Sequence, residues 1–301
     1  MTRPAETVAR MPSGEAHAPD GIRATVCGAL PRAVARQRGF TLVELVMVIA
    51  IAGLVAVLIS TVLSNPLQSF VDQSRRAELV DKASMALNRM AREIRLAVPN
   101  SLTVTGTTLN LLPIAAAGRY RANQPGGAGP RQDPPQCTQT GPACSIELLS
   151  PITASATPHW LIIYNTAVAE LGSTASPSVI SPKSFTWTTS TLSANLQNFR
   201  FKYASPQHRF YLAREVVSYR CAGAGLDPAG TGQGKLWRDS SANLDGSSAS
   251  QALLVDGLSS CSFDYAVATN TRSGLVTLRL TLAEAGETIT LLQQVHVDNA
   301  P

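Results

Sequence analysis

The residue types best suited to chemistry lie together in one short window, RQRGFTLVE at residues 36–44. Gly39 has no side chain, so a membrane-embedded protease could hold its backbone in an extended form close to the membrane surface. Cleavage after Gly39 would leave a free α-amine on Phe40, about one helical turn from Glu44. An acid in an apolar helix is costly and requires a cation, which the amine of a packed neighbour would supply. The window therefore suits a protease at Gly39 and, if the chain is cut before Phe40, a charge pair made by Glu44 with a neighbouring subunit.

The element that must position these residues is an apolar stretch over residues 40–63, whose only charge is Glu44. As a helix it would be about 36 Å long, enough to cross a bilayer. A secretory signal peptide would be shorter and would end in a small-residue cleavage site, so a retained anchor is expected. Arg36 and Arg38 place the N-terminal side in the cytoplasm and the rest of the chain outside. An ordinary signal anchor with a stray interfacial glutamate is the simpler alternative.

The helix is expected to continue as an amphipathic half over residues 64–98, until Pro99-Asn100 stops it. Its apolar face steps by three or four residues, through Val80, Ala83, Leu87, Met90, Ile94 and Val98. Charged residues of both signs occupy the other faces, as on a solvated helix surface. Residues 1–39 have no such periodicity, and we interpret them as an unstructured cytoplasmic leader.

The remainder, residues 99–301, has the pattern of a β-rich domain outside the membrane. Predicted strands are 102–104, 108–112, 159–164, 198–203, 210–219, 261–266, 275–282 and 288–297. Two stretches rich in Gly, Pro, Ser and Asn, residues 121–142 and 222–250, are predicted to be long loops. The expected fold class is α+β, with one long N-terminal helix packed on a mostly antiparallel sheet.

The charge distribution argues against nucleic acid as a partner. The formal net charge is +5, but residues 1–39 carry six arginines against three acids and so contribute +3. The remaining chain holds 19 basic and 17 acidic groups, a net of +2, without a dense basic run containing aromatic residues.

Four of the five cysteines follow the apolar stretch, and an even set in an exported domain favours disulfides. Four cysteines permit three connectivities, of which we favour Cys137–Cys144 with Cys221–Cys261. Four reduced, buried thiols are the alternative. A structural zinc site is disfavoured, since no pair has the two-residue spacing that such sites usually show.

No local motif predicts catalysis, so we expect a protein that is not an enzyme and needs no cofactor or metal. Residues 230–235, GTGQGK, resemble a phosphate loop, but Leu236 stands where the magnesium-binding hydroxyl would be needed. The histidines, His17, His159, His208 and His296, are scattered along the chain. No nucleophile elbow, paired-carboxylate motif or HExxH sequence is present.

The segment RGFTLVELVMVIAIAGLV, within residues 36–65, resembles the prepilin N-terminus shared by type IV pilins and type II secretion pseudopilins. The resemblance implies cleavage after Gly39 by prepilin peptidase, N-methylation of Phe40, and a role for Glu44 in recruiting subunits. It also implies other pilins and an inner-membrane assembly platform as partners. The chain departs from the family in its leader, which is long at 39 residues.

A second resemblance lies in the globular part. Residues 261–301, together with AAGRYR at 116–121, are similar to O-type minor pilins of the mannose-sensitive haemagglutinin (MSHA) pilus. This implies a minor pilin that moves from the inner membrane to a filament or its tip. A J-type secretion pseudopilin is one alternative. Another is an adhesive binding module, in which Trp237 and Arg238 on the long loops would contact a surface receptor.

Overall fold

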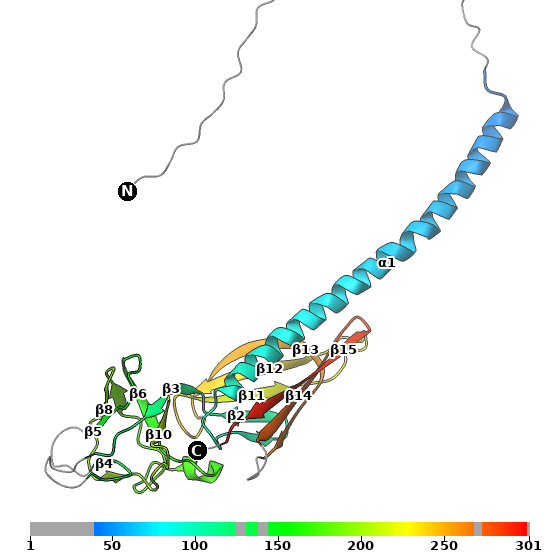
Figure 1. The fold of residues 1–301 in the computed structure, drawn as a ribbon. Helices are drawn as coiled ribbons and strands as arrows, with labels where there is room; N and C mark the ends of the chain where they lie inside the picture. Colours follow the sequence, from blue (N-terminus) through cyan, green and yellow to red (C-terminus); the bar gives the residue numbers. More distant parts are fainter. Residues whose placement is uncertain (1–38, 124–130, 138–143, 268–272, 300–301) are drawn as a thin grey trace, which may run out of the picture. The chain divides into compact units, whose positions relative to one another are not determined.

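The computed structural model describes residues 39–123, 131–137, 144–267 and 273–299, without the side chains of residue 61 and residues 63–68. The chain divides into two units, residues 1–60 and 61–301. One helix, α1 (Leu42–Arg95), contributes residues to both units (Figure 1). The predicted leader, apart from Gly39, lies outside the described residues.

The first unit is described from Gly39, and its helical part, Leu42–Ser60, is apolar enough and long enough to cross a membrane. Its 19 residues correspond to about 28 Å of helix. Every side chain from residue 40 to residue 60 is exposed, including large apolar ones such as Ile49 and Leu54. A helix that is apolar on all sides is stable only when lipid or protein surrounds it.

In the second unit, the C-terminal half of α1 buries one face against the largest sheet. The buried residues are Leu79, Ala83, Ala86, Leu87, Met90, Ala91 and Ile94. The amphipathic pattern therefore predicted the buried face correctly from Ala83 to Ile94, but Val80 is exposed and Leu79 is buried in its place. Leu79 lies four residues before Ala83 and Val80 lies three before it. At about 100° per residue, a step of four rotates the side chain less far from the buried face than a step of three.

The helix ends at Arg95, earlier than the predicted residue 98. Ala97 already forms a β-bridge with Pro113, and the Val98 amide donates to the Leu112 carbonyl at 2.8 Å. Val98 is buried, but in a separate cluster with Trp160 rather than on the helix face.

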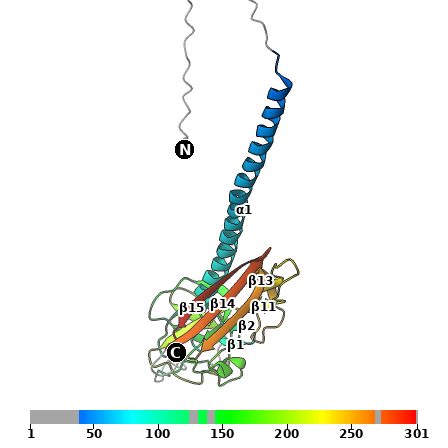
Figure 2. The ribbon, with the colours of Figure 1, turned by 90° about the vertical axis from the view of Figure 1, so that its right-hand side faces the viewer.

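A seven-stranded antiparallel sheet covers the buried face of α1, and Figure 2 shows its strands β13, β14 and β15 side by side. The strand order is β1 (Thr103–Thr105), β2 (Thr108–Leu111), β11 (Val216–Ala222), β12 (Gly234–Ser241), β13 (Ser250–Ala266), β14 (Gly274–Glu284) and β15 (Glu287–Val297). Alternate strand residues such as Leu278, Leu280 and Leu282 are fully buried, as expected for a sheet packed on one face. The α+β prediction is confirmed.

A second sheet is inserted between β2 and β11, in the part of the chain coloured green in Figure 1. Its order is β3 (Ile114–Arg119), β10 (Arg209–Ala213), β6 (Ser155–Ile162), β7 (Phe185–Trp187), β8 (Thr191–Ala194) and β5 (Cys144–Glu147). A two-stranded sheet pairs β4 (Gln136–Cys137) with β9 (Phe199–Arg200), and a short 3₁₀ helix, η2, spans Val168–Gly172. The inserted sheet has its own hydrophobic core, distinct from the core between α1 and the large sheet, and the cluster that contains Val98 and Trp160 is a third.

The strand predicted at residues 210–219 is wrong as a single element. It is two strands, β10 and β11, which belong to different sheets. Arg214 and Glu215 lie between them, where the chain leaves the inserted sheet and re-enters the large one. The strand predicted at 198–203 is reduced to the two residues of β9.

The loop predicted at residues 222–250 is also wrong, because it contains β12, which pairs with β11 on one side and β13 on the other. Its polar residues are stabilised by partners from other elements. Arg238 contacts Glu93 of α1 at 3.1 Å and Glu215 at 2.9 Å, and Asp239 contacts Arg220 at 3.1 Å. These cross-element pairs let a sequence without apolar alternation form an internal strand. The other predicted loop, 121–142, is only partly described and contains β4.

We predict that Arg238→Met destabilises the fold by about 1–3 kcal/mol, because Glu93 and Glu215 lose the cation that they share and Glu93 is mostly shielded from solvent. The side chain of Arg238 is 14% exposed and that of Glu93 is 22% exposed. The midpoint of denaturant unfolding measures the change. Lys235→Met, an exposed site on the same strand, is the matched control and should shift stability by less than about 0.5 kcal/mol. Equal effects at the two sites would contradict a stabilising role for the ion pairs.

His159 of β6 predicts a pH dependence of stability. Burial lowers the pKa of this histidine, because the imidazolium loses its hydration, although the ring Nδ1 bonds the Thr157 carbonyl at 2.6 Å. The unfolded chain therefore binds the proton at a higher pH than the folded chain. The contribution of neutral His159 to stability is complete at neutral pH. It falls as the pH drops from about 6.5, the pKa in the unfolded chain, toward the lower pKa in the folded chain, by at most about 1.4 kcal/mol per pH unit.

Unfolding midpoints measured between pH 7 and pH 5 test this dependence. His159→Phe keeps a ring against Trp187, whose centroid lies 4.6 Å away, and should flatten the profile. His296→Phe on the exposed face of β15 should leave it unchanged. An unaltered profile in His159→Phe would assign the pH dependence to other groups.

The two disulfides of the structure join Cys137 to Cys144 and Cys221 to Cys261, with Cα–Cα distances of 4.9 and 6.5 Å. These are the pairs that the sequence favoured. The first lies in the core of the inserted sheet. The second joins β11 to β13, two strands that have β12 between them in the large sheet.

Candidate functional site

The candidate site is the start of α1, where the window at residues 36–44 enters the apolar helix. Gly39, Phe40 and Thr41 precede the first helical residue, Leu42. Phe40 is 78% exposed, and a side-chain carbon added to Gly39 would meet no atom within 4 Å among the described residues. The Gly39–Phe40 peptide bond therefore lies in non-helical backbone directly before the helix, an arrangement in which a protease can reach it.

Thr41 caps the helix. Its Oγ1 accepts a hydrogen bond from the Glu44 amide at 3.2 Å, and its carbonyl accepts one from the Leu45 amide at 3.1 Å. This is the threonine half of a capping box, in which the acid three residues later can reach back to the cap. The capping role of Thr41 was not among the predictions, although the T-x-x-E spacing of residues 41–44 carries the signal.

Glu44 lies in the first turn of α1, and its side chain is exposed. A carboxylate is favoured there because the unsatisfied amides of a helix start carry partial positive charge. Within the described part of the chain, Glu44 forms no salt bridge. The geometry thus holds the acid close to Phe40 along the chain and leaves its oxygens open to a partner.

One family model matches the chain, the prokaryotic N-terminal methylation motif, over residues 34–60. The match covers the window at 36–44 and most of the apolar stretch. It supports a type IV pilin-like prepilin and implies processing by prepilin peptidase and assembly with other pilins. Together with the apolar helix it fits a membrane-anchored pilin, a structural subunit rather than an enzyme. No curated protein and no solved structure matches the chain.

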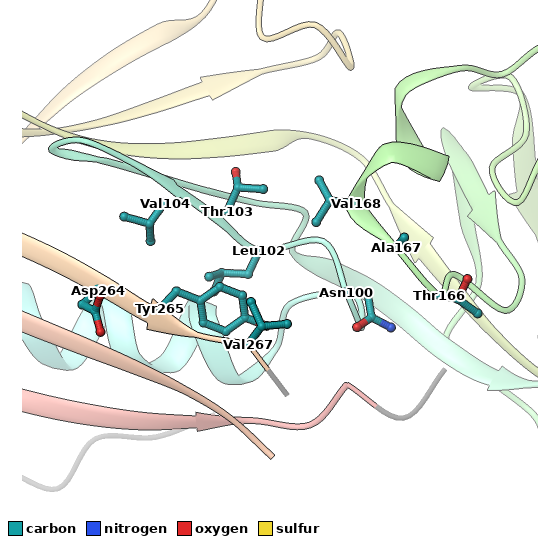
Figure 3. Close-up of a pocket in the computed structure, with 10 residues that line it drawn as sticks. All are labelled: Asn100, Leu102, Thr103, Val104, Thr166, Ala167, Val168, Asp264, Tyr265 and Val267. Carbon is teal, nitrogen blue, oxygen red and sulfur yellow. The ribbon is translucent and has the colours of Figure 1, made fainter. Parts of the chain in front are cut away.

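The second candidate feature is a cavity of about 510 Å³ between β13 and the segments around β1 and η2 (Figure 3). Asp264 and Tyr265 come from β13, and Val168 comes from η2. Several of its polar groups already have partners: Asn299 donates to the Tyr265 hydroxyl at 2.7 Å, and Asn100 donates to the Asn165 carbonyl at 2.9 Å. The cavity offers a mixed lining but no converging set of reactive groups.

The other residues considered in the sequence are not brought together. His159 is buried in the inserted sheet, His208 contacts Asp133 at 2.9 Å, and His296 is on β15. Across the described ranges, no group of three or more His, Cys, Asp or Glu residues could hold a metal ion. Residues 230–235 lead into β12 instead of a helix, so they do not form the strand–loop–helix of a phosphate site.

The adhesive hypothesis loses the residues on which it was based. Trp237 and Arg238 lie within β12, and the Arg238 side chain is largely buried between Glu93 and Glu215. Neither residue lies on a loop.

Proposed function

We propose that this chain is a minor subunit of a type IV pilus-like filament. Prepilin peptidase would cleave it between Gly39 and Phe40, Phe40 would be N-methylated, and the helix would hold the chain in the inner membrane before assembly. The N-terminus would face the cytoplasm and residues 99–301 would lie outside. The observation that carries the proposal is the methylation motif at residues 34–60, which covers the part of α1, residues 42–60, whose side chains are exposed on every side.

The resemblance of residues 261–301 and 116–121 favours the MSHA type of pilus. In the fold, residues 261–301 contribute the end of β13 with β14 and β15, and residues 116–119 belong to β3. A J-type secretion pseudopilin is the second candidate, because pseudopilins share the same processing motif. Neighbouring genes for a secretin and a secretion ATPase would favour the pseudopilin, whereas neighbouring MSHA pilus genes would favour the minor pilin.

Processing is tested by mass spectrometry of the intact protein and its N-terminal peptide, isolated from the native membrane. We expect a mature chain that begins at N-methylated Phe40 and gains about 4 Da on reduction of two disulfides. Gly39→Val should leave the chain uncleaved, because the added side chain prevents the close approach of a protease. The fold should tolerate this change, since the space around Gly39 is open.

Gly53→Ala is the matched control, because Gly53 lies within the helix and the space around it is equally open. This variant should be processed normally. An uncleaved wild-type N-terminus would leave an ordinary signal anchor and would contradict the filament role.

A further inference from the structure

The strand β13 extends beyond the part that pairs with β14. On one side, its residues from Ser250 to Leu258 pair with β12. On the other side, pairing with β14 begins only at Leu258, opposite Leu282. Within the described parts of the chain, no strand pairs with the β14-facing edge of residues 250–256. A row of backbone donors and acceptors is therefore open at this edge.

This open edge borders a groove of about 580 Å³ between β13 and the C-terminal half of α1. The groove contains exposed apolar surface, since Met85 is 66% exposed and Leu253 is 47% exposed. The charged side chains that line it are Lys82, Arg89 and Arg92 from the helix and Asp256 from the strand, a net of 3 − 1 = +2.

Two of these cations have partners on α1: Lys82 bonds Glu78 at 2.8 Å, and Arg89 lies 3.6 Å from Glu93. Both carboxylate oxygens of Glu93 also accept from Arg238 Nε, so the charge of Glu93 is shared between two arginines. Arg92 is exposed and forms no salt bridge in the part of the chain that the structure describes. Arg238 is in turn paired with Glu215, so Arg92 is the lining cation that is left to face a strand added at the open edge.

We infer that the edge at residues 250–256 binds an extended, acidic segment of another protein by strand addition, with its side chains in the groove beside α1. Backbone hydrogen bonds to an open edge supply binding, and alternate side chains of the added strand supply specificity. Arg92 selects an acidic side chain, and Met85 and Leu253 contact apolar ones. The edge belongs to the unit of residues 61–301, so the inference does not depend on the filament role.

The shape of β13 limits the added strand. The register with β12 shifts between Leu236 and Trp237 and again between Gly234 and Lys235, which places irregularities in β13 near Leu254 and Gly257. Such irregularities bend a strand and often protect an edge from pairing over a long stretch. The bound segment is therefore short, and contacts in the groove contribute a substantial part of its affinity.

The full-length protein in detergent provides the test, with a short synthetic peptide in which glutamate and valine take turns on one face of the strand and threonine occupies the other face. Amide hydrogen exchange should show protection of residues 250–256 on binding. A peptide with lysine in place of glutamate should bind more weakly. The glutamate peptide with every backbone N–H methylated should not protect the edge, because it keeps the side chains but lacks the donors.

Arg92→Glu should weaken binding of the glutamate peptide by roughly three- to tenfold and improve binding of the lysine peptide. Arg95→Glu is the matched control, because Arg95 is exposed on the same helix but does not line the groove. The inference is overturned if the glutamate peptide gives no protection at up to about millimolar concentration. Equal binding of the methylated peptide, or equal effects of the two substitutions, would overturn it as well.

Discussion

Glu44→Gln is expected to lower incorporation of the protein into filaments by tenfold or more while leaving its amount in the membrane unchanged. In the proposed assembly, Glu44 of one subunit pairs with the α-amine of Phe40 of a neighbour inside an apolar helix bundle. Removal of one partner from a desolvated charge pair leaves the other uncompensated, which typically costs about 2–5 kcal/mol. Sheared filaments and membrane fractions, compared by quantitative immunoblot, measure the change.

The substitution removes charge with little change in shape. The backbone N–H of residue 44 donates to Thr41 Oγ1, so this hydrogen bond does not involve the Glu44 side chain. Glutamine also suits the third position of a capping box. The helix start should therefore remain intact. Glu78→Gln is the matched control, since it neutralises an exposed acid farther along α1 that is paired with Lys82. Wild-type incorporation of Glu44→Gln would refute the assembly role, and a similar loss in both variants would indicate a general effect of charge.

Replacement of Cys221 and Cys261 by alanine is expected to destabilise the globular part by about 4 kcal/mol. The two cysteines are 40 residues apart, and closing a loop of this length restricts the unfolded chain strongly. Cys221 is also buried in the core between α1 and the large sheet, so its replacement removes packing at the same place. Denaturant unfolding of the oxidised full-length protein gives the change in midpoint and in free energy.

The other disulfide is the natural comparison. Cys137 and Cys144 are seven residues apart, and the same loop-entropy relation gives about 2 kcal/mol for their removal. The double alanine variant at 137 and 144 should therefore lose less stability than the variant at 221 and 261. Reduction of both disulfides in the wild type should lower the free energy of unfolding more than either double variant does. A larger loss from the short loop would show that strain or local packing, rather than loop closure, determines the contribution of each bond.

One predicted loop, residues 222–250, and one predicted strand, residues 210–219, show where the sequence pattern was insufficient. Residues 234–241 contain lysine, arginine, aspartate and serine without apolar alternation, and only contacts with other elements make them a strand. Glu93 on α1 and Arg220 on β11 neutralise its charges, yet Glu93 is 145 residues away from Arg238. Residues 210–219 failed for the opposite reason, because apolar residues continue across a change of sheet. A one-dimensional pattern does not contain the break at Arg214 and Glu215.

The α+β class, the membrane-length helix and the face that α1 buries from Ala83 to Ile94 could be predicted from the order of the residues, and the proposed processing site rests on the same information. These depend on local order: a run of apolar residues, a period near 3.6, and a short window of basic, small and acidic residues. The tertiary structure was needed to show that the strands form more than one sheet, that β12 is an internal strand, and that β13 leaves an edge open. These depend on contacts between distant residues, whose free energy decides the fold where local preferences are weak.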